Sequence, residues 1–186
     1  MPTDTLNQIL GVLTLASHIG LGIFFILLLI QSYTKKQIPF FGKFVLFLKK
    51  NFLAFAFTVA TFSTITSLFY SEIAHLPACS MCWYQRIFLF PQVFLLGMAL
   101  YKKDNHIIDY GILLSLVGAL LAIYHILLQN GVKLYTPCSV NTTLVSCSDQ
   151  LFSYFGYITI PVMSLTAFVM ILILLILARQ KREKYA

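Results

Sequence analysis

Five long apolar runs, separated by short polar segments, dominate the pattern along the chain. They cover about Leu6 to Ile30, Phe52 to Tyr70, Trp83 to Tyr101, Tyr110 to Gln129 and Tyr157 to Ala178. Each run is close to the roughly 20 residues that a helix needs to cross a hydrocarbon core of about 30 Å. Uninterrupted runs of this length favour helices over a barrel, whose strands alternate over about ten residues. The pattern predicts an all-α membrane protein with five spans.

Composition agrees with this interpretation. Hydrophobic residues make up 59% of the 186 residues, charged residues only 10%, and the mean hydropathy is +0.86. Soluble globular domains carry about 25% charged residues, so this chain lacks the mixed surface that they need. The first run has no positively charged segment before it and carries Asp4 instead, so we interpret it as a retained helix with its N-terminus outside rather than as a signal peptide.

Positive charges predict the orientation of the spans. Eleven of the thirteen lysines and arginines fall on one side of the predicted bundle, after the first, third and fifth runs. By the positive-inside rule that side is cytoplasmic, which leaves Arg86 and Lys133 outside and the C-terminus inside. The net charge of +7 therefore reports topology and attraction to anionic lipid, and it gives no argument for nucleic acid.

Two pairs of cysteines fall on the predicted outer side. Cys79 and Cys82 lie in the short connection before the third span, and Cys138 and Cys147 lie in the loop of residues 130–156. Disulfides form and persist in such compartments, so the pairs indicate thiol–disulfide chemistry. Two alternatives remain open. The four thiols could bind zinc, although the nine-residue spacing of the second pair is unusual for it. They could also staple the outer loops, although a C-x-x-C ring has little structural value.

The motif "CSMCWYQRI" at residues 79–87 carries the most specific chemistry. Pro77 suits the start of a new helix, so Cys82 is expected in its first turn, where unpaired backbone N–H groups favour a thiolate. Arg86 follows four residues later on the same face, where it would stabilise a thiolate and donate to an electron-rich oxygen. An interfacial arginine without a chemical role is the alternative.

A histidine is expected near this motif. The fourth span ends near Gln129, which places His125 about one turn from the outer surface, at a depth similar to that of Arg86. A histidine within a span is a candidate functional residue, and a structural, hydrogen-bonded histidine is the alternative. His18, near the middle of the first span, has no reactive residue predicted at its depth, and we interpret it as structural.

Together these residues carry a family resemblance. "CSMCWYQRI", "YHILLQ" at 124–129, the later cysteine pair and "GYITIP" at 156–161 resemble the DsbB family of membrane disulfide bond formation proteins, and most of all its short-looped BdbC-like branch. The resemblance covers residues 51–178. It implies a four-helix bundle, a bound quinone (ubiquinone or menaquinone) and a DsbA-like thioredoxin-fold partner, in the cytoplasmic membrane with the redox cysteines on the extracytoplasmic side.

The resemblance also implies roles for single residues. Cys82 corresponds to the cysteine that contacts the quinone, Cys79 to its disulfide partner and Arg86 to the quinone-facing arginine. Cys138 and Cys147 correspond to the pair that exchanges with the soluble partner, and His125 is expected beside the quinone. Residues 1–50, an extra helix with a basic loop, and the basic tail of residues 179–186 lie outside the resemblance.

Two other classes stay open on sequence alone. An enzyme of the vitamin K epoxide reductase type would share the bundle, the quinone and four cysteines, but its loop pair precedes the C-x-x-C, whereas here it follows. A membrane protein with disulfide-stapled outer loops and no enzymatic activity would need no Arg86.

Overall fold

A computed structural model of the chain describes residues 2–34, 39–102, 106–132, 147–148 and 153–185. They form α1 (Pro2–Thr34), α2 (Pro39–Lys50), α3 (Phe52–Leu68), a π-helical turn η1 (Phe69–Ile73), α4 (Ser80–Lys102), α5 (Ile107–Gln129) and α6 (Ile160–Tyr185). Within these ranges there is no β-strand, and Tyr154 and Ile158 form an isolated antiparallel bridge. The predicted all-α class is confirmed.

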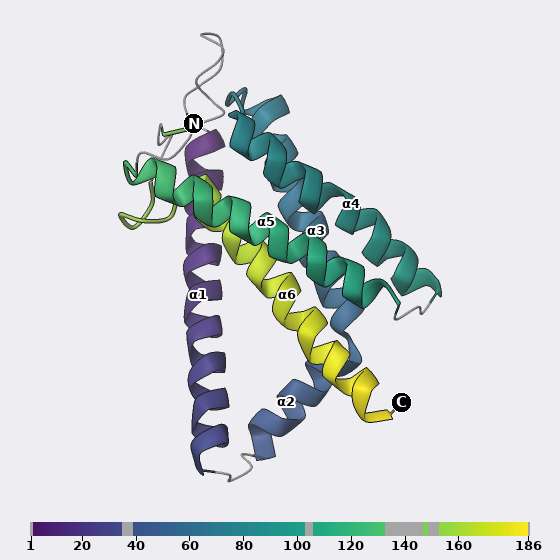
Figure 1. The fold of residues 1–186 in the computed structure, drawn as a ribbon. Coiled ribbons are helices and arrows are strands. Elements are labelled where there is room, and N and C mark those ends of the chain that lie inside the picture. The colour runs from purple at the N-terminus through teal and green to yellow at the C-terminus, as the bar shows by residue number, and fades with distance from the viewer. Residues whose placement is uncertain (1, 35–38, 103–105, 133–146, 149–152, 186) are drawn as a thin grey trace.

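Four helices form a bundle and two lie outside it. Helix α3 contacts α4 and α6, and α5 contacts the same two helices, so that the four close into a ring (Figure 1). The apolar core takes residues from all four, including Ala60, Leu96, Ala119 and Phe168. Helix α1 stands beside this ring and contacts α6, while α2 contacts α3 and α6. The expected four-helix bundle with an additional N-terminal helix is present, and the short helix α2 lies outside the bundle as well.

Two glycines let α5 and α6 approach closely. A Cβ atom at Gly118 would lie 2.3 Å from the ring of Phe168, and one at Gly111 would lie 2.6 Å from Leu175. Both neighbours are fully buried side chains of α6. Small residues at such positions are typical of helix packing in membranes, where close backbone approach supplies much of the association energy.

Four helical segments are long and apolar enough to cross a membrane: Asn7–Gln31, Phe52–Ile73, Ile107–Gln129 and Ile160–Arg179. The predicted third span is helical too, as the 23-residue α4, but it is not among these four. It carries the polar side chains Gln85, Arg86 and Gln92 in its interior, all three buried. Four of the five predicted spans are therefore helices long and apolar enough to cross a membrane, and the crossing by α4 stays a prediction.

The segment interpreted as a basic loop after the first span contains a helix, α2. Its Phe41 is buried against Phe24 of α1 and Leu177 of α6, and Lys49 and Lys50 occupy its last turn, where cations complement the helix dipole. The basic composition concealed this helix, because lysines suit a helix end as well as a loop. Helix α2 joins α1 to the end of the bundle opposite the C-x-x-C motif (Figure 1).

Candidate functional site

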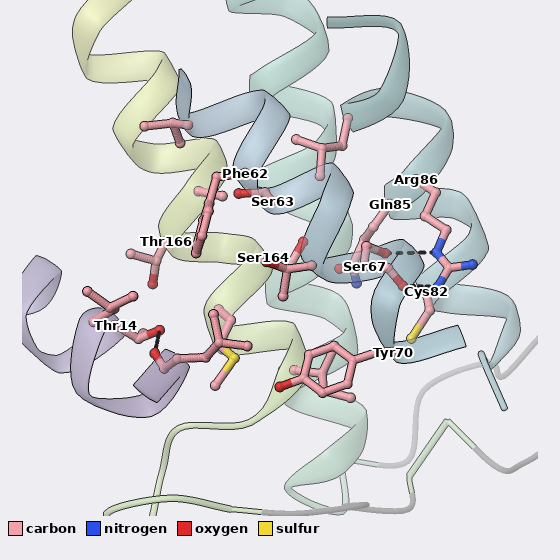
Figure 2. A pocket seen from close by; sticks show the side chains of 18 of the residues that line it. Thr14, Phe62, Ser63, Ser67, Tyr70, Cys82, Gln85, Arg86, Ser164 and Thr166 are labelled. Atoms are coloured by element: carbon pink, nitrogen blue, oxygen red, sulfur yellow. Dashed lines mark hydrogen bonds between the residues drawn. The ribbon is translucent and has the colours of Figure 1, made fainter. Parts of the chain in front are cut away.

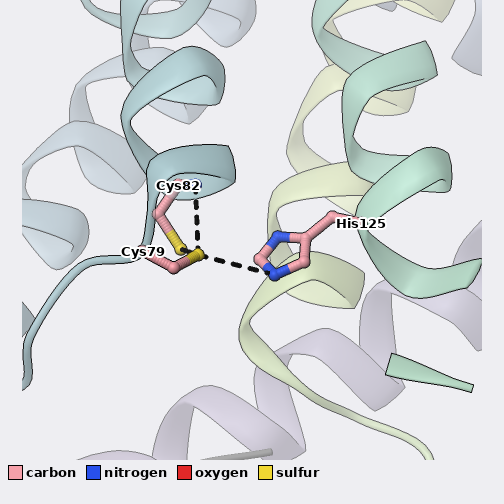
Figure 3. Close-up of side chains that lie close together, drawn as sticks. All are labelled: Cys79, Cys82 and His125. Carbon is pink, nitrogen blue, oxygen red and sulfur yellow. Dashed lines mark hydrogen bonds between the residues drawn. The ribbon is translucent and has the colours of Figure 1, made fainter. Parts of the chain in front are cut away.

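The C-x-x-C cysteines lie where α4 begins (Figure 3). Cys79 directly precedes the helix, and its carbonyl accepts a hydrogen bond from the backbone N–H of Trp83 at 3.2 Å. Its Sγ atom accepts one from the backbone N–H of Cys82 at 3.4 Å. Cys79 therefore acts as the N-cap of α4, with its sulfur facing the free N–H groups of the first turn. Both cysteines are free thiols with their sulfurs 3.1 Å apart.

This geometry corrects one expectation. From the sequence we expected the free backbone N–H groups of the first turn to stabilise a thiolate at Cys82. In the structure the backbone N–H of Cys82 donates to Sγ of Cys79 instead. A side chain in the N-cap position faces the free N–H groups, whereas a side chain within the first turn points away from the helix axis. Of the two thiols, Cys79 is the one whose anion the helix favours.

His125 of α5 lies against the same sulfur. Its Nε2 atom is 3.6 Å from Sγ of Cys79, and its Nδ1 atom is 3.1 Å from the side-chain amide nitrogen of Gln85. Because that amide nitrogen donates, Nδ1 accepts and the ring proton is on Nε2, which donates to the sulfur. Gln85 is 5% exposed and His125 2%, so both bonds are shielded from solvent.

These contacts determine the ionisation of Cys79. The hydrogen bond from the Cys82 thiol and the His125 ring lower the pKa of Cys79 to about 4, although burial opposes the charged form. Of the two thiols in the reduced protein, Cys79 is therefore the one that ionises first. A thiolate is the reactive form in disulfide exchange.

Arg86 lies one turn deeper along α4. Its Nε donates to Oγ of Ser67 at 2.9 Å and its guanidinium donates to the Ser67 carbonyl at 3.0 Å. The guanidinium carbon also lies 4.9 Å from the ring centre of Trp83, a cation–π contact. These contacts hold the cation in place at 8% exposure while leaving other N–H groups available for a ligand.

A cavity of about 350 Å³ opens beside Arg86 (Figure 2). Residues of α1, α3, α4 and α6 line it, and most of its wall is apolar. Cys82, Gln85 and Arg86 of α4 line it together with hydroxyl side chains from the other helices, whereas Cys79 and His125 are not among the lining residues. Its volume falls in the range of small-molecule sites, about 300 to 1,000 Å³.

Cys147 reaches the same region from the outer loop. It is 2% exposed, disulfide-bonded and packed in one cluster with Cys79, Met81 and Leu128. Cys138, predicted as its companion in exchange, lies outside the described residues. The structure thus brings together Cys79, Cys82, His125 and Arg86 at the start of α4, with Cys147 beside them.

Sequence reasoning missed Gln85 and Ser67. Gln85 had a signal, because a glutamine between the motif cysteines and Arg86 is a polar residue in an apolar run. Ser67 had none, since it lies 19 residues from Arg86 on another helix. Only the packing of α3 against α4 brings it to the guanidinium.

The same cluster has the composition of a metal site. The ligand atoms of Cys79, Cys82 and His125 all lie within 4.8 Å of one another. Three such ligands suit a soft ion such as Zn²⁺, but structural zinc sites use four. The pKa of Cys79 and its helix cap are explained without an ion.

Comparison with known proteins gives a consistent result. The family model for disulfide bond formation protein DsbB matches residues 49–178. The probable disulfide formation protein C 2 of Bacillus anthracis is 36% identical over 141 residues, 74% of this chain and 96% of that protein. The probable disulfide formation protein of Chlamydia caviae is 40% identical over 139 residues, 74% and 98% of the two chains. Disulfide bond formation protein C of Bacillus subtilis is 36% identical over 138 residues, 72% and 96%. No solved structure gives a significant match.

Proposed function

This chain belongs to the DsbB family of disulfide bond formation proteins, and we propose that its oxidant is a membrane quinone and its soluble partner a DsbA-like thioredoxin-fold protein. Membership makes the chain a membrane oxidoreductase that catalyses disulfide bond formation. The identity of the oxidant and of the partner goes beyond the family assignment and rests on the site.

The cavity carries the quinone proposal. Cys82 and Arg86 share the wall of a largely apolar space of about 350 Å³, which suits an apolar ring bearing carbonyl oxygens. Arg86 has N–H groups beyond the two bonded to Ser67, and these would hold a quinone carbonyl. When bound, the quinone supplies an acceptor for the two electrons and two protons of the Cys79–Cys82 dithiol.

The two motif cysteines take different roles in this proposal. Cys79 does not line the cavity and belongs to the cluster that contains Cys147, so in this proposal it is the sulfur that exchanges with the loop pair. A loop thiolate attacks Cys79, the Cys79–Cys82 bond breaks, and Cys82 leaves as a thiolate on the cavity wall beside Arg86. The second loop thiol then resolves the mixed disulfide and leaves Cys79 and Cys82 as a dithiol.

The loop cysteines connect this dithiol to the soluble partner. Reduced partner gives two electrons and two protons to the Cys138–Cys147 disulfide and becomes oxidised, and the loop pair passes them to Cys79 and Cys82. The position of Cys147 next to Cys79 supports the second exchange. His125 was expected beside the quinone; its bond to Cys79 supports a role in stabilising the exchanging thiolate instead.

Location follows from the same requirements. We place α4 in the membrane as a fifth span, because its 23 residues reach about 34 Å at 1.5 Å per residue. The cysteine end faces the extracytoplasmic side of a cytoplasmic membrane, and the lysine-rich segments and the C-terminus face the cytoplasm. A quinone then reaches the cavity from the bilayer, and a soluble partner reaches the loop from outside.

Extraction of bound lipid tests the proposal. The full chain, purified in mild detergent, should release ubiquinone or menaquinone on solvent extraction, and mass spectrometry would identify it. A preparation stripped of lipid should rebind a short-chain quinone, with quenching of Trp83, the single tryptophan, next to Arg86. A preparation that contains no quinone and shows no quenching by added quinone would refute the quinone assignment.

A further inference from the structure

We propose that helix α1 is a wall of the quinone site and determines how tightly the quinone binds, which rests on the proposed function. The family model matches from residue 49, so α1 lies outside the matched region. Four of its residues nevertheless line the cavity: Leu10, Leu13, Thr14 and Ser17. Their spacing of three and four positions places them on one face of the helix.

This face of α1 contributes to the cavity by the shape of its side chains rather than by donating hydrogen bonds. Thr14 donates its hydroxyl proton to the Leu10 carbonyl and Ser17 donates to the Leu13 carbonyl, each at 2.8 Å. Both protons are used within the helix, so α1 presents two leucines and two compact side chains to the cavity. On the far side of the cavity stands Arg86, with the hydrogen-bond donors. A flat ring would lie between Arg86 on α4 and the leucine and hydroxyl side chains of α1 (Figure 2).

Three hydrogen bonds hold this stretch of α1 against the bundle, one before it and two after it. Tyr70 donates its hydroxyl proton to Oδ1 of Asn7 at 2.6 Å, and both side chains are buried. His18 bonds through Nε2 to the hydroxyl of Thr166 at 2.8 Å and through Nδ1 to the hydroxyl of Tyr157 at 3.1 Å. Tyr70 and Thr166 are themselves lining residues, so the bonds join α1 directly to the cavity wall.

A glycine sets the distance between α1 and the rest of the protein. A Cβ atom at Gly11 would lie 3.2 Å from Cβ of Tyr154, closer than ordinary side-chain contact. By contrast, a Cβ atom at Gly20, on the same helix, would meet nothing within 4 Å. A large side chain at Gly11 would therefore wedge the cavity-lining turn of α1 away from the bundle, and the same side chain at Gly20 would not.

Binding of a short-chain quinone to the full chain, followed by quenching of Trp83, compares these two positions. We expect Gly11→Leu to weaken binding about tenfold, comparable to losing about two methylene contacts, and Gly20→Leu to bind like the unmodified chain. Equal affinity of all three proteins would overturn the role of α1. Absence of quenching in the unmodified chain would instead overturn the proposed quinone function, so the two failures are distinguishable.

Photolabelling of the unmodified chain is independent of any effect of the variants on folding. A photoreactive short-chain quinone bound to the full chain should label the peptide that contains Leu10 to Ser17, together with peptides of α3 or α6. Competition by unmodified quinone should remove both labels. Labels confined to α3, α4 and α6 would show that the ring does not touch α1, and the inference would be wrong.

Discussion

The four-residue step from Cys82 to Arg86 is the part of the site that local geometry fixes, because both residues lie on one face of α4 and line one cavity. That pairing could be predicted from sequence. The hydrogen-bond partners around them could not be predicted. Gln85 fixes the tautomer of His125, 40 positions away on another helix, and Ser67 holds Arg86 from 19 positions away. No periodic pattern encodes such contacts.

The Gln85–His125–Cys79 chain predicts a pH effect. Replacing Gln85 by leucine frees Nδ1 to carry the ring proton, so Nε2 no longer donates to the thiolate and the pKa of Cys79 should rise from about 4. The thiolate of the reduced protein would then be lost at a higher pH as the solution is acidified. Thiolate ultraviolet absorbance across a pH titration measures this.

The matched control is Gln92→Leu, the same change in the same helix. Gln92 bonds to Ser115 rather than to His125, so its loss should leave the titration of Cys79 where it was. Identical titrations for Gln85→Leu and the unmodified chain would show that the amide does not act on the thiolate.

Arg86 predicts an effect on quinone use. Lysine keeps the charge but lacks the planar set of donors that bonds to Ser67 while leaving further N–H groups free. Loss of a hydrogen bond from a charged group costs about 1.5 to 3 kcal/mol, so Arg86→Lys should raise the KM for quinone by about tenfold or more. Arg179→Lys, at the half-exposed ion pair with Asp109, is the control and should leave the KM unchanged. An unaltered KM in Arg86→Lys would remove Arg86 from quinone binding.

At the scale of elements, the lengths of the apolar runs predicted where the long helices lie along the chain, but not how the helices pack against one another. The runs predicted all five long helices, with ends that differ by up to seven residues, but not the helix α2. A short helix with lysines at its end has too few apolar positions to be distinguished from a loop. The role of α1 was also invisible. Asn7 and His18 are polar residues in an apolar run, but the sequence does not show which residues they contact, because their partners lie 63 to 148 positions away.

The close approach of α5 and α6 predicts a stability effect. Gly118→Ala places a methyl group against the buried ring of Phe168, which must shift, and overpacking of this kind costs about 1 to 3 kcal/mol. Thermal unfolding in detergent should therefore occur at a lower temperature. Gly22→Ala, where a Cβ atom meets nothing within 4 Å, provides the comparison. If both variants unfold like the unmodified chain, the described packing of the two helices is wrong.

At the scale of the whole molecule, the distribution of lysines and arginines along the chain predicted which helix ends lie on the same side of the bundle. The structure has the start of α1 near the start of α4, where the cysteines lie, and the end of α6 at the opposite end of the bundle (Figure 1). The lysines and arginines of the last helix and of the segment before α3 are the argument for placing the α6 end in the cytoplasm.

Reporter fusions test this orientation. A reporter that is active only in the cytoplasm should work when fused after Ala186 and should fail when inserted in the loop of residues 130–156. A periplasmic or extracellular reporter at the same two sites should give the reverse result. Activity of the cytoplasmic reporter in the loop would put the cysteines in a reducing compartment, where stable disulfide transfer does not occur.

The central claim is that electrons from a soluble dithiol reach a quinone through Cys79 and Cys82. The most direct measurement mixes the purified full chain, a reduced thioredoxin-fold partner and a short-chain quinone without oxygen, and follows quinone loss and partner thiols together. The account predicts one quinone reduced for each partner disulfide formed, and no quinone loss in Cys82→Ser or in a chain lacking both Cys138 and Cys147. Partner oxidation without quinone loss, or undiminished turnover in Cys82→Ser, would contradict it.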